Sequence, residues 1–192
     1  ITAGGSLTLQ AGEGIVLSND IEALPSSTAN MVIASDFESA GDGTLTLVAS
    51  KTITSNNSTM TITAWDIDLA GSLTAGIAAV TIHGAKVGQT LGFGQTAQDM
   101  HVEDAELGRV SAQGGLTIGS STTGSITLDG ITDSSSDMLG TVVLLATGAS
   151  QLVTFGGVSS EFNKGITVQA AGGVVLSASV TSKQSSTQLY TG

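Results

Sequence analysis

The sequence predicts an all-β protein built as a single-stranded parallel β-helix, a solenoid in which successive turns of chain stack lengthwise. Three observations predict this fold: short alternating strands that recur along the chain, a near absence of hairpin turn pairs, and a composition dominated by small and β-branched residues. We expect residues 1–192 to form one continuous β-helical segment of a longer tandem-repeat protein.

The composition favours narrow, repetitive sheets over helices and over disorder. Gly, Ser and Thr supply 26, 25 and 26 of the 192 residues, and aromatic residues only 3%. Gly, Ser and Thr are weak helix formers. A disordered chain would be poor in aliphatic residues, but 40% of this chain is hydrophobic and its mean hydropathy is +0.33. The chain therefore has enough Leu, Ile, Val and Ala to fill a sheet interior.

The predicted strands are aliphatic–Thr–aliphatic triplets, which place the aliphatic residues on one face and Thr on the other. The clearest copies span 6–9, 44–47, 115–118, 125–128 and 165–168, with looser ones at 60–63 and 79–82. Asp42-Gly43 and Asp129-Gly130 are the only candidate hairpin pairs. Pairs of triplets about 40 residues apart indicate turns of about 20 residues, hence nine or ten turns in a rod of roughly 45 Å.

Two further features refine this prediction. Met60, Ile62 and Ala64 share one strand face, whereas Ile67 and Leu69 have the opposite parity, so we expect a corner between Ala64 and Trp65. Residues 84–108 fit the repeat poorly.

A longer repeat relates the two ends of the chain. Residues 6–28 align without gaps with residues 165–187 at an offset of 159, with ten identities in 23 positions. The prediction is a repeat unit of about 159 residues that restarts near residue 165, with neighbouring copies stacked end to end.

The runs at 5–17 (Gly-Ser-Leu-Thr-Leu-Gln-Ala-Gly-Glu-Gly-Ile-Val-Leu) and at 115–129 resemble the repeats of filamentous haemagglutinin-type proteins. That resemblance implies a large secreted adhesin with a right-handed parallel β-helix. It also implies an extracellular or cell-surface location and surface glycans or receptors as partners. Irregular turn lengths and the lack of a visible secretion-domain pattern are departures from the family.

Charge and cysteine content exclude several classes of function. The formal net charge is −11, and the five basic residues are scattered singly, so no cationic cluster is available for nucleic acid. No apolar run is long enough to span a bilayer, so we expect no membrane insertion. The chain contains no Cys, which excludes disulfides, thiol catalysis and thiolate metal sites.

The strongest candidate for chemistry is the alternating set Asp99, His101 and Glu103, which a strand would aim at one face with Met100 and Val102 facing inward. These groups are suited to a divalent metal or to acid–base chemistry. The competing interpretation, which we favour, is a solvated strand face beside an acidic turn. Asp66 and Asp68, next to Trp65, form a similar outward pair.

Weaker candidates concern calcium and glycans. A set of five acidic residues has the ligand chemistry for weak Ca²⁺ binding: Asp36, Glu38, Asp42, Asp133 and Asp137. Asn56 and Asn57 begin overlapping N-glycosylation sequons, which would make a eukaryotic form a glycoprotein. His83 is expected to be an outward strand residue near a turn. We expect no cofactor.

The function predicted is therefore non-catalytic: a structural and adhesive segment of an extracellular fibre or filament. Two alternatives remain open. Paired carboxylates also occur in β-helical enzymes that act on polysaccharides, and a carbohydrate-binding module is a related alternative. Thr-x-Thr runs at 44–46, 52–54 and 59–63 indicate an ice-binding solenoid, if they fall in register on one face.

Overall fold

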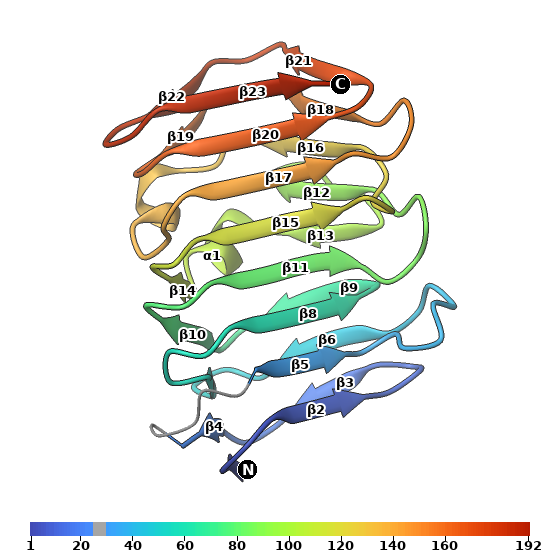
Figure 1. The fold of residues 1–192 in the computed structure, drawn as a ribbon, viewed down its shortest axis with the longest axis vertical. Coiled ribbons are helices and arrows are strands. Elements are labelled where there is room, and N and C mark those ends of the chain that lie inside the picture. Colours follow the sequence, from blue (N-terminus) through green and yellow to red (C-terminus); the bar gives the residue numbers. More distant parts are fainter. Residues whose placement is uncertain (25–29) are drawn as a thin grey trace.

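Parallel β-sheets make up nearly all of the structure, a computed structural model that describes residues 1–24 and 30–192 (Figure 1). All the strand pairs in the described residues are parallel, and most connect strands from successive turns of the chain. The all-β class and the parallel pairing are confirmed. The arrangement is consistent with the β-helix that the sequence predicts.

One sheet of eight strands, called the long sheet below, runs the full length of the molecule (Figure 1). Its strands are, in spatial order, β2 (Leu7–Gln10), β5 (Met31–Ala34), β8 (Met60–Ala64), β11 (Val80–Gly84), β15 (Leu116–Ser120), β17 (Val142–Ala146), β20 (Ile166–Ala170) and β23 (Thr187–Thr191). Spatial order follows chain order throughout, because each turn of chain adds one strand to this sheet.

The remaining strands form shorter sheets on the other sides. One side has a five-stranded sheet of β1 (Thr2–Ala3), β4 (Ile21–Ala23), β7 (Thr52–Thr54), β10 (Ser72–Gly76) and β14 (Val110–Ala112). A two-stranded sheet consists of β19 (Ser160–Phe162) and β22 (Val180–Ser182). A three-stranded sheet consists of β3 (Ile15–Leu17), β6 (Thr44–Leu47) and β9 (Asp66–Leu69). A second five-stranded sheet consists, in spatial order, of β13 (Met100–Val102), β12 (Leu91–Gly94), β16 (Ile126–Asp129), β18 (Leu152–Phe155) and β21 (Gly173–Leu176). The helices are short: α1 (Asp104–Leu107) and the 3₁₀ helix η1 (Asp133–Ser136).

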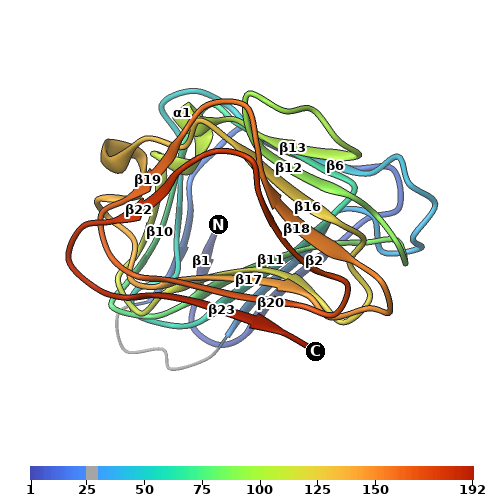
Figure 2. The ribbon, with the colours of Figure 1, turned by 90° about the horizontal axis from the view of Figure 1, so that it is seen from above.

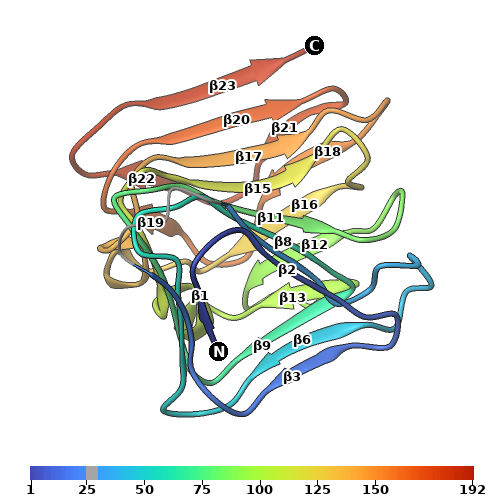
Figure 3. The same ribbon diagram turned by 60° about the horizontal axis from the view of Figure 1, so that its bottom comes forward.

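Viewed along the stack, the sheets form the sides of a roughly triangular outline, with the long sheet as one side (Figure 2). The N- and C-termini lie at opposite ends of the stack (Figures 1 and 3). No helix in the described residues is long and apolar enough to cross a membrane.

Most turns of chain are longer than predicted, and their lengths vary, as the irregular spacing of the triplets indicates. Leu7 pairs with Met31, 24 residues later, whereas Val80 pairs with Leu116, 36 residues later. The expected length of about 20 residues holds from Met60 to Val80 and nearly so from Ile166 to Thr187. It is wrong for the other turns, and the count of nine or ten turns is wrong with it. The excess lies in the loops and in the turn between β11 and β15, which contains β12, β13 and α1. This insertion explains why residues 84–108 fit the repeat poorly.

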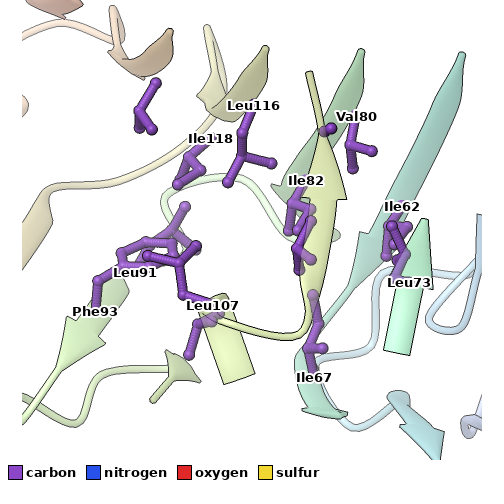
Figure 4. Packing of buried hydrophobic residues seen from close by; sticks show 14 of the residues in the cluster. Ile62, Ile67, Leu73, Val80, Ile82, Leu91, Phe93, Leu107, Leu116 and Ile118 are labelled. Atoms are coloured by element: carbon purple, nitrogen blue, oxygen red, sulfur yellow. The ribbon is translucent and has the colours of Figure 1, made fainter. Parts of the chain in front are cut away.

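The interior is filled by files of aliphatic side chains that run along the stack (Figure 4). In the long sheet one inward file consists of Leu9, Ile33, Ile62, Ile82, Ile118, Leu144, Val168 and Leu189. Its six inner members from Ile33 to Val168 are at most 2% exposed. Leu189, at the C-terminal end, is 40% exposed because no strand covers it.

The predicted corner at Ala64 and Trp65 is confirmed. Ala64 ends β8 in the long sheet and is fully buried, and β9 begins at Asp66 with Ile67 and Leu69 facing inward. Trp65 is half-buried at the corner, where Gly41 packs against its ring.

The repeat of 159 residues has a structural counterpart in the described residues. Strands β2, β3 and β4 correspond in sequence to β20, β21 and β22. β2 and β20 lie in the long sheet, whereas β3 and β21, like β4 and β22, belong to different sheets. The matched Ser26, Ser27 and Thr28 lie outside the described residues. That this unit recurs in tandem stays a prediction.

Candidate functional site

The candidate site lies where two of the short sheets meet on one side of the stack. The three-stranded sheet β3-β6-β9 ends at β9, and the five-stranded sheet β13-β12-β16-β18-β21 begins at β13. Strands β9 and β13 lie against each other without sharing a sheet. We call this boundary the seam. Its polar side chains line a depression of about 300 Å³: Asp66, Asp68, His101, Glu103, Glu106 and Arg109.

The seam exists because one turn of chain contributes two strands to the same sheet. After β12 the chain leaves through Gly94, at φ +82°, and returns to form β13 parallel to β12, with Leu91 opposite Met100. The carbonyl oxygen of Thr96, in the returning segment, lies where a Cβ on residue 92 would be. Only Gly at position 92 leaves room for this approach.

At the seam, side chains make the hydrogen bonds that a ladder of strands would otherwise make. Asp66 Oδ1 accepts a hydrogen bond from the His101 backbone N–H at 2.9 Å. Both backbone groups of Leu69, at the end of β9, are satisfied by side chains from the next turn. Glu106 Oε1 accepts from its N–H, and Arg109 Nη1 donates to its carbonyl, each at 2.7 Å. These groups tie β9 to the turn above it.

Glu106 is the most buried acid of the seam, at 7% exposure. Its second oxygen accepts from the Glu103 N–H at 2.9 Å, as part of the capping box that starts α1. Burial raises the pKa of Glu106, and the charges of Glu103 and Asp68 raise it further. The N–H donors of Leu69 and Glu103 oppose this rise in pKa.

The alternating set Asp99, His101 and Glu103 is only partly brought together. Met100 and Val102 face inward as predicted, and His101 and Glu103 both line the depression. Asp99 is instead bonded to Thr90, whose N–H and hydroxyl both donate to its Oδ2. His101 Nε2 lies 2.8 Å from the Gly94 carbonyl.

Asp99 and His101 are thus held at opposite ends of β12, at Thr90 and at Gly94. Across residues 1–24 and 30–192, no group of three or more His, Asp and Glu side chains is placed to hold a metal ion. Asp66 and Asp68 do point outward from β9 into the depression, as their alternation predicts.

The five acidic residues considered for calcium lie at different corners of the stack. Residues 36–42 join the long sheet to β6, whereas η1 lies on the far side, ahead of β17 (Figures 1 and 2). Asp36 is 1% exposed, and its two oxygens accept from the N–H groups of Ala40 and Gly41, each at 2.9 Å. Asp133 forms an ion pair with Lys183. The grouping of all five in one site is therefore wrong.

Asn56 and Asn57 hold successive turns of chain together. Both have positive φ, +50° and +67°. The Asn56 amide donates to the Ala23 carbonyl in the turn below, and Asn57 Oδ1 accepts from the Ile77 N–H in the turn above, at 3.0 Å. Asn57 is exposed and Asn56 half-buried, so a glycan would fit more easily on Asn57.

The remaining expectations concern histidine and threonine. His83 is a half-buried outward residue of β11, with Nε2 3.2 Å from Thr63 Oγ1. The Thr-x-Thr runs fall on three different sheets: 44–46 in β6, 52–54 in β7 and 59–63 in β8. These three runs therefore do not combine into one array.

Glu106 and Arg109 were not among the site residues predicted from the sequence. The pattern that identifies Glu106 is present, because Glu103-Asp104-Ala105-Glu106 has an acceptor at the N-cap and Glu three residues later. Nothing local identifies Arg109, whose partner Leu69 lies 40 residues earlier.

The seam is thus a set of polar groups whose hydrogen bonds hold backbone segments. Comparison of the chain with models of protein families, with curated proteins and with solved structures gave no match in any of the three.

Proposed function

We propose that this chain is a non-catalytic, structural and adhesive segment of an extracellular fibre, built as a right-handed, single-stranded parallel β-helix. The observation that carries the proposal is the long sheet, in which eight successive turns of chain stack in order. Each turn pairs with the next through backbone hydrogen bonds, so every added turn lengthens the molecule without widening it. The right hand follows from the strong preference of parallel crossover connections for that hand.

The seam supports a structural role rather than a catalytic one. Asp66, Glu106 and Arg109 use their side chains to hold the backbone of neighbouring turns. Groups committed to such bonds are poorly available for a substrate, because a buried backbone group left unpaired is costly. We accordingly propose no cofactor.

The proposed partners are neighbouring copies stacked end to end, with surface glycans or receptors contacting the exposed loops. Stacking is favoured by the match between β2–β4 and β20–β22, since each set would offer the following turn the same kind of strand edge. In β3 that edge is covered by β6, with Ile15 opposite Leu45. In β21 the equivalent edge has no paired strand among the described residues, and Leu176 is 56% exposed.

Duplicating the repeat tests the rod. A second copy of residues 6–164 is inserted between Lys164 and Gly165, in the register of the 159-residue offset. Six strand spacings separate β2 from β20 in the long sheet, so we expect the maximum dimension from small-angle X-ray scattering to grow by about 29 Å. The cross-sectional radius should stay unchanged. A wider particle, or two separate lobes, would refute the proposal.

The extracellular, adhesive part of the proposal needs its own test. Antibodies against the chain should label intact cells of the source organism, and purified protein should bind a glycan array or host-cell surfaces. Labelling that appears only after the cells are lysed would place the protein inside the cell and contradict this part, whatever the shape of the rod.

A further inference from the structure

The outward face of the long sheet carries no Asp, Glu, Lys or Arg on any of its eight strands. We call this surface the uncharged face. Its outward residues lie in two files: Thr8, Val32, Thr61, Thr81, Thr117, Val143, Thr167 and Gln188 in one, and Gln10, Ala34, Thr63, His83, Gly119, Leu145, Gln169 and Tyr190 in the other. The first file runs in register from one end of the sheet to the other. The second is in register on either side of a break between His83 and Gly119, because the pairing of β11 with β15 ends at Ile82 and Ile118.

The lack of charge sets this face apart from the rest of the molecule. The chain has 16 acidic and five basic residues, and other sheets carry some of them in their strands. Asp66 and Asp68 project from β9, Asp129 from β16 and Glu161 from β19. A copy that approached those sides would meet like charges, because the formal net charge is −11.

The side chains of the uncharged face suit packing against another sheet. Thr and Val occupy seven of the eight positions of the first file, and they are short, stiff at χ1 and uniform in height. Sheets with such surfaces pack face to face about 10 Å apart. Val143 and Leu145 add apolar area on β17.

We propose that a second copy of this chain packs on the uncharged face, so that two rods associate side by side through their long sheets. This goes beyond the function proposed above, because that function requires only contacts along the rod. The charge distribution selects the occupant: of the sheets, the long one alone has strands without Asp, Glu, Lys or Arg along the full length of the described stack.

The available area fits a reversible dimer. Seven strand spacings and strands of four to five residues give a face of about 34 by 15 Å. Two such faces bury about 1,000 Å², near the lower limit for a specific interface. An interface in which the same patch serves both copies closes at two, so association should stop at the dimer.

Sedimentation velocity on the intact chain tests the proposal, with Thr117→Lys as the variant. Thr117 is a half-buried outward residue at the middle of the uncharged face. We expect the wild type to form a dimer with a Kd in the micromolar range and Thr117→Lys to weaken it at least tenfold. The added cation lowers the magnitude of the net charge, so general repulsion between copies cannot explain this loss. Thr81→Lys, on the neighbouring strand, should behave in the same way.

The matched control is Thr127→Lys. Thr127 is likewise a half-buried outward Thr within a parallel strand, but it lies on β16, whose sheet carries Asp129. We expect its dimer to match that of the wild type. Raising the salt concentration should strengthen the wild-type dimer, since salt screens the repulsion between two acidic chains.

Four outcomes would overturn the proposal. The first is a wild type that stays monomeric at millimolar concentration in high salt. The second is an equal loss of association in Thr117→Lys and Thr127→Lys. The third is an open-ended series of oligomers that Thr117→Lys retains. This third outcome would show that the copies associate through the ends of the rods. The fourth is a monomer that inhibits ice recrystallisation and loses this activity in Thr117→Lys, which would identify ice as the occupant. None of the four bears on the rod itself, which the duplication experiment tests separately.

Discussion

The long sheet and the seam connect successive turns of chain by different means. In the long sheet every inner strand pairs through its backbone with a strand on each side, and its outward side chains are free of that task. At the seam β9 and β13 do not share a sheet, and the side chains of Asp66, Glu106 and Arg109 make the connecting bonds. A regular ladder tolerates many outward residues, whereas an irregular insertion depends on particular polar ones.

The largest expected effect lies inside the long sheet. Leu144 is fully buried between Ile118 and Val168, so Leu144→Ala should lower the free energy of unfolding by about 2–5 kcal/mol. Leu145→Ala, on the outward side of the same strand, should cost under about 1 kcal/mol. Urea denaturation followed by circular dichroism measures both. Equal losses in the free energy of unfolding would mean that inward and outward residues of the long sheet contribute equally to stability.

The seam should respond to the loss of a single acceptor. Glu106→Ala leaves the N–H groups of Leu69 and Glu103 without their partner, which should cost about 1–3 kcal/mol in the free energy of unfolding. Glu161→Ala, an exposed acid on β19, is the control and should change little. If both variants unfold like the wild type, side chains do not hold the seam together.

The cost of Glu106→Ala should also depend on pH. Burial raises the pKa of Glu106 in the folded chain above its ordinary value of 4.5, so the protonated form favours the folded state. The advantage of the wild type over Glu106→Ala is then fully present below pH 4.5. It shrinks as the pH rises through the raised pKa of the folded chain. Urea titrations of both proteins at several pH values, with Glu161→Ala alongside, measure the difference. An advantage that grows with pH would contradict the cause assigned to the shift.

The same contrast explains how far the sequence could be interpreted. Strand alternation is local, so the inward and outward residues of 6–9, 115–118 and 165–168 could be predicted, as could the corner after Ala64. The length of a turn could not, because loops and insertions change it without altering the strands. This is why a turn of about 20 residues was too short an expectation for most of the stack.

The seam was predicted in part for the same reason. Asp66, His101 and Glu103 were recognised as outward polar residues, because alternation within β9 and β13 shows which way they point. Their partners were not, since the bond of Arg109 to Leu69 depends on how turns 40 residues apart are stacked. The uncharged face was missed similarly: the strands that compose it are separated by 20 to 36 residues, and only their register brings them together.

The smallest effect is expected at the one ion pair among the described residues, between Lys183 and Asp133. It also joins two turns, and its Nζ–Oδ2 distance is 2.6 Å, but 64% of the Lys183 side chain is exposed. The hydrogen bond that Lys183 donates to Asp133 raises the pKa of Lys183, yet solvent and salt screen such a pair strongly. Lys183→Ala should therefore leave the urea midpoint unchanged within error, in low salt and in 1 M NaCl alike. A loss as large as that of Glu106→Ala would show that an exposed ion pair can stabilise the stack as well as buried hydrogen bonds do. The sensitivity of the seam to substitution would then be a property of polar contacts in general. It would not result from the break in backbone pairing between β9 and β13.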